Sequence, residues 1–391
     1  MKTTKFKPSE VGPIPEEWEV KALGEVGVFS KGLGVSRSES NSGALPCVRY
    51  GEIYTDYNDY IKEFRSFISE KVAAGAKLMS PGDILFAGSG ETKEEIGKTV
   101  AFLGGVDRAY CGGDILILSP SRGYDSKFLG YVCNSQPIAA QKASRGQGDA
   151  VVHIRSGSLA EVVIPVPPRP EQEKIAEALS DVDGLLAAMT KLIEKKRAIK
   201  QGAMQQLLTG KKRLAGFTGK WVEKRLGDML VIGNGKDYKH LEPGPIPVYG
   251  TGGLMTYVAE WLYDGPTVCI GRKGTIDVPQ YHEGKLWTVD TLYYTYDFKD
   301  VDPKFLYYLF LTIDWQSYNS ATGVPSLTAK AIYEIEVVVP TLVEQQAIAL
   351  VLSDMDAEIA ALEATRAKYE SIKQGMMQEL LTGKTRLVET G

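Results

Sequence analysis

Two long segments of this chain carry closely related sequences, and this repeat constrains the fold more than any other feature. The first segment reads EQEKIAEALSDVDGLLAAMTKLIEKKRAIKQGAMQQLLTGKKRL from Glu171, and its counterpart begins at Glu344 and ends in KQGMMQELLTGKTRL. The copies align without a gap, and about half of their positions are identical. A chain that contains two copies of one unit is expected to fold into two similar halves.

Apolar residues recur in both copies at the alternating three- and four-residue spacing of a coiled coil. This pattern predicts one long helix per copy, from about Glu171 to Leu208 in the first, with Gly210 and Gly383 as the glycines that follow the helix ends. Gly202 and Gly375 lie inside the helices at a cost of about 1 kcal/mol each, and we interpret them as sites of close approach or bending. The expected helix-helix seam comprises Ile175, Leu179, Val182, Leu186, Met189, Ile193, Ile348, Leu352, Met355, Ile359 and Leu362.

Each helix has a suitable partner in the other copy. Two repeats in one chain close most simply with pseudo-twofold symmetry, which for two helices means antiparallel packing. At 1.5 Å per residue, about 38 residues make a rod of ~57 Å. The fold expected is mixed α+β, with two globular domains separated by an antiparallel coiled coil.

The rest of the chain divides into domains around these helices. We expect a first domain over residues 1–168, a helix over 169–214, a second domain over 215–340, and a second helix with its tail over 341–391. Related stretches after Trp18 and Trp221 show that the repeat includes the domains, and both tryptophans are expected to be buried. The first domain is longer, so we place an insertion within residues 51–79.

Composition narrows the class of protein. The 391 residues carry a formal net charge of −4, which argues against a generally basic nucleic-acid binder, so any DNA surface must be local or completed by a partner. No apolar run approaches a membrane span and the start is no signal peptide, so a cytoplasmic protein is expected. Four scattered cysteines and three histidines predict buried thiols and no metal site.

Three stretches resemble catalytic motifs, and none is complete. Residues 86–90 resemble a loop that binds S-adenosylmethionine, but no catalytic Asp-Pro-Pro-aromatic segment accompanies it. Asp83, Glu91 and Lys93 mimic the pattern of a metal-dependent nuclease, which is common by chance in so charged a chain. Residues 271–275 lack the spacing of a phosphate-binding loop. The chain is expected to be non-catalytic.

Two variable α/β domains, each followed by a long helix that ends in a KQGxMQxLLTGKxRL segment, resemble the specificity subunit of type I restriction-modification systems. The resemblance implies two target recognition domains that read a bipartite, asymmetric DNA site with a non-contacted spacer. It also implies two methyltransferase subunits docked on the helices, which methylate adenine N6, and restriction subunits that translocate and cleave DNA. S-adenosylmethionine, ATP and Mg²⁺ would then belong to these partners, and this chain would hold no cofactor.

If the domains read DNA, donor side chains on glycine-rich loops are the expected contacts. Gly32 and Gly235 lie at the same distance after Trp18 and Trp221 and begin one such loop in each domain. The candidates are Lys31, Arg37, Ser89, Lys93, Arg145 and Gln147 in the first domain, and Lys236, Tyr238, Lys239, Arg272, Lys273, Asn319 and Thr322 in the second.

The expected docking face for the partners is apolar and lies beside the seam. Two other functions remain open from the residues alone, namely an interaction scaffold that does not bind DNA and a stand-alone nuclease built on Asp83. The residues proposed for the docking face are Leu185, Ala188, Leu207, Leu208, Leu380 and Leu381.

Overall fold

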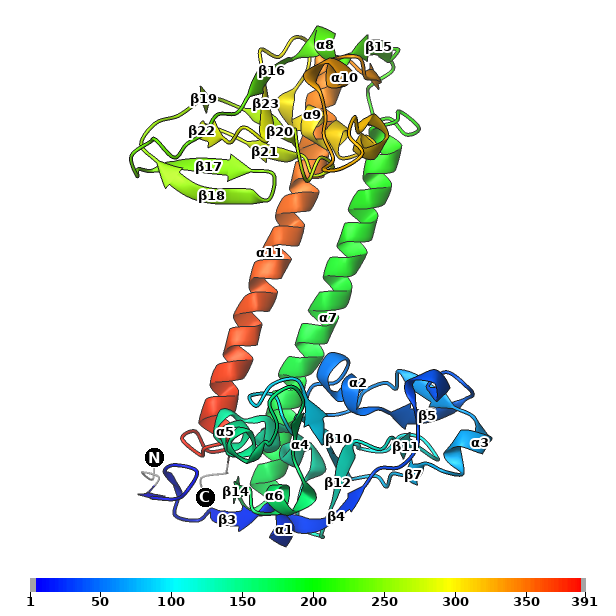
Figure 1. The fold of residues 1–391 in the computed structure, drawn as a ribbon, viewed down its shortest axis with the longest axis vertical. Helices are drawn as coiled ribbons and strands as arrows, with labels where there is room; N and C mark the ends of the chain where they lie inside the picture. Colours follow the sequence, from blue (N-terminus) through cyan, green and yellow to red (C-terminus); the bar gives the residue numbers. More distant parts are fainter. Residues whose placement is uncertain (1–4, 388–391) are drawn as a thin grey trace. The chain divides into compact units, whose positions relative to one another are not determined.

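The computed structural model describes residues 5–387, which divide into two compact units (Figure 1). The first unit contains the described residues up to Ala188 and those from Arg366 onward, and the second contains Met189–Thr365. Each unit therefore combines one sheet domain with one end of each long helix. None of the helices within residues 5–387 has the length and apolarity needed to span a bilayer.

The sheet domain of the first unit contains two four-stranded sheets. One consists of β10 (Thr99–Ala101), β8 (Ile84–Ala87), β12 (Ile115–Pro120) and β4 (Gly27–Lys31) in this order, with antiparallel neighbours throughout. The other consists of β6 (Ser66–Ile68), β5 (Leu45–Val48), β11 (Tyr110–Cys111) and β7 (Lys77–Leu78), of which β5 and β11 are parallel.

The second unit repeats this topology strand for strand. Its antiparallel sheet is β21 (Gln280–His282), β20 (Thr267–Gly271), β23 (Leu292–Tyr296) and β16 (Val231–Asn234). Its mixed sheet is β18 (Gly253–Val258), β17 (Ile246–Gly250), β22 (Lys285–Thr288) and β19 (Tyr263–Asp264), with β17 and β22 parallel. The two sheet-rich domains predicted from the repeat are thus confirmed.

The units differ after the first strand of the mixed sheet. In the first unit β5 is followed by α2 (Tyr50–Thr55) and, after β6, by α3 (Glu70–Ala73), whereas β17 turns directly into β18. These helices lie where the sequence predicts an insertion.

Short elements close each domain against its long helix. The strand β3 (Glu19–Ala22) pairs with β14 (Val163–Val166), as β15 (Val222–Arg225) pairs with β24 (Glu336–Val339). The helix α4 (Ser126–Asn134) corresponds to α9 (Pro303–Phe310), and Asp125 and Asp302 cap the two through their carboxylates. The remaining elements are β1 (Phe6–Lys7), β2 (Ile14–Pro15), α1 (Leu23–Val26), η1 (Arg37–Glu39), β9 (Ser89–Gly90), α5 (Gln136–Arg145), β13 (Val152–His153), α6 (Ser156–Ala160), α8 (Leu226–Met229), η2 (Trp315–Tyr318) and α10 (Ala329–Tyr333).

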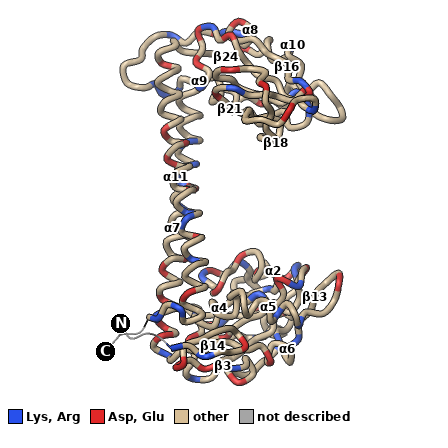
Figure 2. Tube along the Cα trace, turned by 90° about the vertical axis from the view of Figure 1, so that its left-hand side faces the viewer, with Lys and Arg blue, Asp and Glu red and all other residues tan. Residues whose placement is uncertain are grey.

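The two long helices are α7 (Arg169–Leu207) and α11 (Leu342–Leu380), and within each unit their segments run antiparallel. Figure 2 shows basic and acidic residues interspersed along both. Of the predicted seam, Val182, Leu186, Met355 and Leu362 are half-buried and the other seven residues are buried. Gly210 and Gly383 adopt positive φ angles of 68° and 71° after the helices, as expected.

One prediction about the helices is wrong, and another is contradicted in part, since bending at Gly202 and Gly375 stays a prediction. A Cβ atom built on Gly202 or Gly375 would meet nothing within 4 Å, so neither glycine marks a close approach within the chain. The leucine pairs proposed for the docking face are buried, because Leu207 and Leu208 pack into the core of the second domain and Leu380 and Leu381 into that of the first. Leu185 and Ala188 are exposed, as expected.

A half-buried lysine joins the two helices to the domain in the first unit. Lys373 of α11 lies 2.8 Å from an oxygen of Asp183 on α7 and 2.9 Å from an oxygen of Asp59, and Tyr131 of α4 donates to Asp183 at 2.5 Å. We call these four residues the Lys373 clamp. Because both carboxylates are buried, the lysine offsets charges that water does not reach.

The second unit repeats this arrangement with one carboxylate fewer. Lys200 of α7 binds Asp356 of α11, and Tyr308 of α9 donates to Asp356 at 2.7 Å. We call these three residues the Lys200 clamp. Its lysine and aspartate are the repeat counterparts of Lys373 and Asp183, so the duplicated sequence encodes duplicated contacts.

A second pair of contacts fixes the helix starts. Glu171 is buried and accepts hydrogen bonds from Trp18 Nε1 at 3.0 Å and from Arg386 Nε at 2.6 Å. In the second unit Glu344 is buried and accepts from Arg213, but Trp221 is only half-buried and its Nε1 atom has no hydrogen-bond partner in the described chain. The predicted burial of the tryptophans is therefore complete only for Trp18.

This difference predicts unequal effects of one substitution. Trp18→Phe removes a donor from a buried carboxylate and should lower the free energy of unfolding by about 1 to 3 kcal/mol. Trp221→Phe removes no hydrogen bond, so its effect should stay within about 1 kcal/mol. Urea denaturation of the two variants beside the unchanged protein measures both, and equal losses would contradict the assignment.

Candidate nucleic-acid interface

Three predicted loops converge in the first unit. The pairing of β9 with β13 places Ser89 opposite His153, and the bridge between Gln147 and His153 holds the loop after α5 beside them. Together with the end of β4, these loops surround a cavity of about 360 Å³. Its lining includes four predicted residues, Lys31, Ser89, Arg145 and Gln147, and three others, His153, Arg155 and Ser158.

Gly32 explains why the chain can turn at Lys31. A Cβ atom at Gly32 would lie 2.0 Å from the carbonyl oxygen of Gly112, and one at Gly235 would lie 1.9 Å from that of Val289. Only glycine allows this backbone approach. In each domain a lysine is therefore the sequence neighbour of a glycine at which two backbone segments approach closely. These lysines are Lys31, beside Gly32, and Lys236, beside Gly235.

The cavity around Lys31 is predominantly basic. Lys31 and Arg155 are exposed, Arg145 is half-buried with its Nη1 atom donating to Gln141 O at 3.1 Å, and Asp114 is the carboxylate in the lining. Glu161, outside the lining, lies 4.0 Å from Arg145 Nε, so three cations face two carboxylates, and the remaining positive charge favours an anion such as a DNA phosphate. We call Lys31, Arg145 and Arg155 the basic cluster.

Ser89 is less accessible than expected. Its side chain is 5% exposed, and its hydroxyl lies 2.9 Å from His153 Nδ1. It can reach DNA only if this contact opens. Lys93 lies on the exposed loop after β9 and lines neither cavity of this domain described here.

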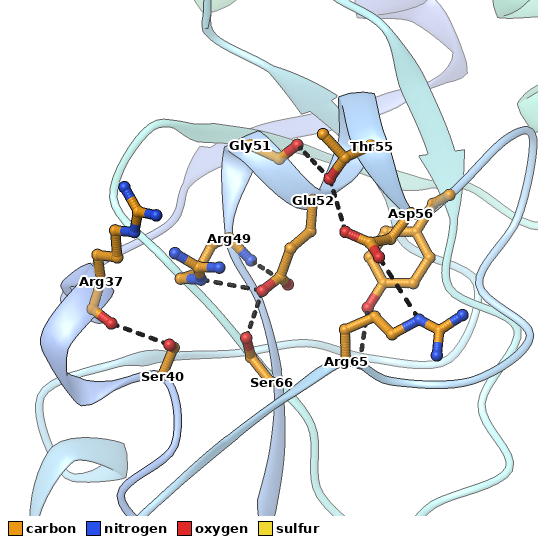
Figure 3. Close-up of polar contacts among 10 residues, drawn as sticks. Arg37, Ser40, Arg49, Gly51, Glu52, Thr55, Asp56, Arg65 and Ser66 are labelled. Carbon is orange, nitrogen blue, oxygen red and sulfur yellow. Dashed lines mark hydrogen bonds and ion pairs between the residues drawn. The ribbon is translucent and has the colours of Figure 1, made fainter. Parts of the chain in front are cut away.

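A larger cavity of about 920 Å³ opens beside the first, and Asp114 lines both. Figure 3 shows three of its arginines, the predicted Arg37 on η1, and Arg49 and Arg65, which the sequence reasoning missed. The sequence offers no signal for Arg49, because a capping box requires a side chain that accepts a hydrogen bond at the N-cap position, which arginine cannot do.

The Glu52 side chain holds Arg49 in place through hydrogen bonds. The Glu52 side chain accepts from Arg49 Nε at 2.9 Å, from the Arg49 backbone N–H at 3.1 Å, and from the Ser66 hydroxyl. Glu52 and Ser66 are each 3% exposed. The Arg49 guanidinium is therefore fixed through Nε, whereas its two Nη groups make no hydrogen bond to the described residues 5–387 (Figure 3).

In the second unit the structure also joins predicted loops. Lys273 bridges to Ser326, and the Gly274 N–H donates to Pro325 O at 2.9 Å, which holds the turn after β20 against the loop that carries Asn319 and Thr322. Asn319 Oδ1 accepts from the backbone N–H groups of Ala321 and Ser326, so its oxygen shapes this loop and its amide NH₂ remains the free group.

Of the other predicted residues of the second domain, Lys236, Tyr238 and Lys239 follow Gly235, and Arg272 follows β20. Trp287 Nε1 donates to Lys236 O at 2.8 Å, which fixes the backbone of this loop. The side chains of Lys236 and Lys239 are exposed, and Tyr238 is half-buried against the core. Arg272 is half-buried with its guanidinium 5.9 Å from the centre of the Tyr293 ring.

The nuclease reading finds no support in the geometry. Asp83 is 5% exposed, and its carboxylate accepts from the Ser80 N–H at 2.8 Å and from the Ser119 hydroxyl at 2.7 Å. No group of three His, Cys, Asp or Glu side chains within residues 5–387 could hold a metal ion.

All four cysteines are buried, and burial raises the pKa of each thiol to about 12.

Comparisons with known proteins all identify sequences of the same family. The family model described as type I restriction modification DNA specificity domain matches residues 15–200 and 218–374. Two Methanocaldococcus jannaschii proteins named as type I restriction enzyme specificity subunits, those of MjaX and MjaVIII, are 26% and 23% identical over 99% of this chain and cover 98% and 97% of their own lengths.

Solved structures share the fold. The S subunit of a type I restriction-modification system from M. genitalium superimposes with a TM-score of 0.64 at 19% identity, covering 93% of this chain and 96% of that one. A chain from a structure of the assembly and conformational transition of a type I system gives a TM-score of 0.56 at 17% identity over 95% of this chain and 99% of that one.

Proposed function

The chain belongs to the type I restriction modification DNA specificity family, and we propose that it reads a bipartite, asymmetric DNA site with one half-site per sheet domain. As a specificity subunit, it is a non-catalytic component of its system. The observation that carries the bipartite reading is the duplicated scaffold, which repeats the two four-stranded sheets strand for strand but places different side chains on the corresponding loops.

The differences between these loops support an asymmetric site. The turn after the central strand carries Ser89 in the first domain and Arg272 with Lys273 in the second. Base recognition depends on which donors and acceptors reach the groove. Two domains with one scaffold and different loop residues therefore suit two different half-sites.

Two methyltransferase subunits on the long helices complete the proposed assembly, and restriction subunits join it for cleavage. Exposed apolar side chains support such docking, since Leu192 and Ile199 stand one heptad apart on α7 and are 40% and 48% exposed in the second unit. S-adenosylmethionine, ATP and Mg²⁺ would be bound by the partners, and the complex would act on DNA in the cytoplasm.

The partners would also supply much of the affinity. The net charge of −4 limits the attraction of this chain to DNA, and its basic cluster is local. Phosphate contacts by the methyltransferase subunits would add to those of the basic cluster, and the assembled complex should bind DNA with a steep dependence on salt.

Mapping of N6-methyladenine tests the proposal directly. Cells that express this chain with its neighbouring methyltransferase should carry a two-part methylated motif, and cells that lack only this chain should lose every methylated copy of it. The control is re-expression of the chain in the deleted cells. Methylation that is unchanged without the chain would refute its role as the specificity subunit.

A further inference from the structure

The larger cavity of the first domain differs in charge from the basic cluster. Its lining carries Arg37, Arg49 and Arg65, but also the carboxylates of Glu39, Glu52, Asp56 and Asp114. Carboxylates beside cations repel a phosphate, whereas the edge of a base pair presents both donors and acceptors. This balance of charge suits base edges better than the DNA backbone.

We propose that Arg49 reads a guanine in the half-site recognised by the first domain, with Glu52 and Ser66 as its positioning residues. This assignment rests on the proposed function and names one base-reading residue within it. An arginine recognises guanine by donating two hydrogen bonds to O6 and N7 in the major groove. The two Nη groups of Arg49 are the donors available for this contact.

The surroundings of Arg49 preorganise these donors. Its Nε atom and its backbone N–H both bind Glu52, whose carboxylate is in turn bound by Ser66. The Arg49 side chain is 28% exposed and that of Glu52 is 4% exposed, so the fork faces the cavity while its support is shielded from water. A guanidinium held in this way loses little conformational entropy on binding.

The neighbouring arginines are held less firmly. Arg65 contacts Asp56 at 3.5 Å with a side chain that is 59% exposed, and Arg37 is exposed on η1. The second domain has no counterpart of α2, the helix that carries Glu52, because β17 turns directly into β18. A guanine contact through Arg49 would therefore be specific to the first domain.

The test compares Arg49→Lys with the unchanged protein in the complex with its methyltransferase subunit. Lysine keeps the charge but removes the planar fork. The methylated motif should become degenerate at one G·C pair of one half-site, and preference for guanine there should fall roughly 5- to 150-fold in binding assays with single-base substitutions. The other half-site should keep its sequence. Arg108→Lys, at a residue that pairs with Glu70 outside both cavities, is the matched control and should leave the motif unchanged.

A change in the DNA tests the same contact without altering the fold. The guanines of both half-sites are replaced one at a time by 7-deazaguanine, which removes only the N7 acceptor. One such replacement should weaken binding by the unchanged protein and weaken binding by Arg49→Lys by a smaller factor, because lysine lacks the planar fork. Ser66→Ala should lower the same preference by a smaller factor, because it loosens Glu52.

Several results would overturn the assignment. One is a motif that Arg49→Lys leaves unchanged at every position, and another is a set of half-sites in which no guanine depends on its N7 atom. A loss of affinity that is equal for all sequences, with a salt slope reduced by about one, would make Arg49 a phosphate contact instead. An unchanged complex that shows no sequence preference would refute the proposed function itself, and this assignment with it.

Discussion

Replacing Lys373 by alanine is expected to lower the free energy of unfolding of the first unit by about 3 to 5 kcal/mol. The substitution leaves the carboxylates of Asp59 and Asp183, with side chains 7% and 10% exposed, without the cation that joins them. Removing one partner of a buried ion pair leaves the other charge buried without compensation. This lowers the free energy of unfolding far more than the loss of a surface ion pair does. Hydrogen exchange of residues 126–134 and 366–380 in the full chain would measure the loss.

The Lys200 clamp is the matched control for this prediction. Lys200→Ala strands one carboxylate, and the side chain of Asp356 is 41% exposed, so the cost should be clearly smaller and confined to the second unit. Burial alone would lower the pKa of Lys373, but the two aspartates outweigh this and raise it above its usual value. The contribution from the lysine charge is therefore complete below pH ~10.5 and is lost as the pH rises through the raised pKa. Equal losses in the two variants would contradict this account.

Removing the basic cluster should have the largest effect on DNA binding. The combined variant Lys31→Ala, Arg145→Ala, Arg155→Ala deletes three candidate phosphate contacts. With a slope of about 0.9 per contact, the salt dependence of log K should decrease by about 2.7, and affinity at 0.1 M salt should fall by about 500-fold relative to a common value at 1 M. Titration of the assembled complex with its DNA at several salt concentrations measures both quantities.

The control for this variant removes the same charge elsewhere. Lys5, Lys71 and Arg122 are exposed and line neither cavity, so their replacement by alanine should leave the slope almost unchanged. The methylated motif should be the same in both variants, because phosphate contacts carry no sequence information directly. A basic-cluster variant with an unaltered slope would show that DNA passes elsewhere on the domain.

The helices were predictable because a repeat and a heptad pattern support the same conclusion independently. The seam from Ile175 to Ile193 is buried or half-buried as expected. The pattern could not tell that Leu207 and Leu380 are covered by the domains, since an apolar helix end looks the same whether a core or a partner subunit covers it. Lys200 and Lys373 also read as surface lysines until the structure places carboxylates beside them.

The close backbone approaches at Gly32 and Gly235, which begin two of the candidate loops, could be predicted because glycine marks positions where the backbone must pass closely. Which side chains on these loops face a common cavity depends on strand pairing. The pairing of β9 with β13 brings Arg155 to Lys31, although they are far apart in the sequence. Arg49 was missed because its importance depends on Ser66 and Glu52, which meet only in the folded domain.

The Lys373 clamp and the pairing of Arg386 with Glu171 also have a consequence for the order of folding during synthesis. Lys373 and Asp59 are separated by 314 positions, and Arg386 and Glu171 by 215. Domains usually fold as the ribosome releases them, the N-terminal one first. Here the first domain emerges with Glu171, Asp183 and Asp59 still lacking their cations, and it receives them only when the last helix leaves the ribosome. The corresponding ion pairs of the second unit lie within residues 189–365 and can therefore form earlier. The first domain is thus synthesised first but completes its contacts last.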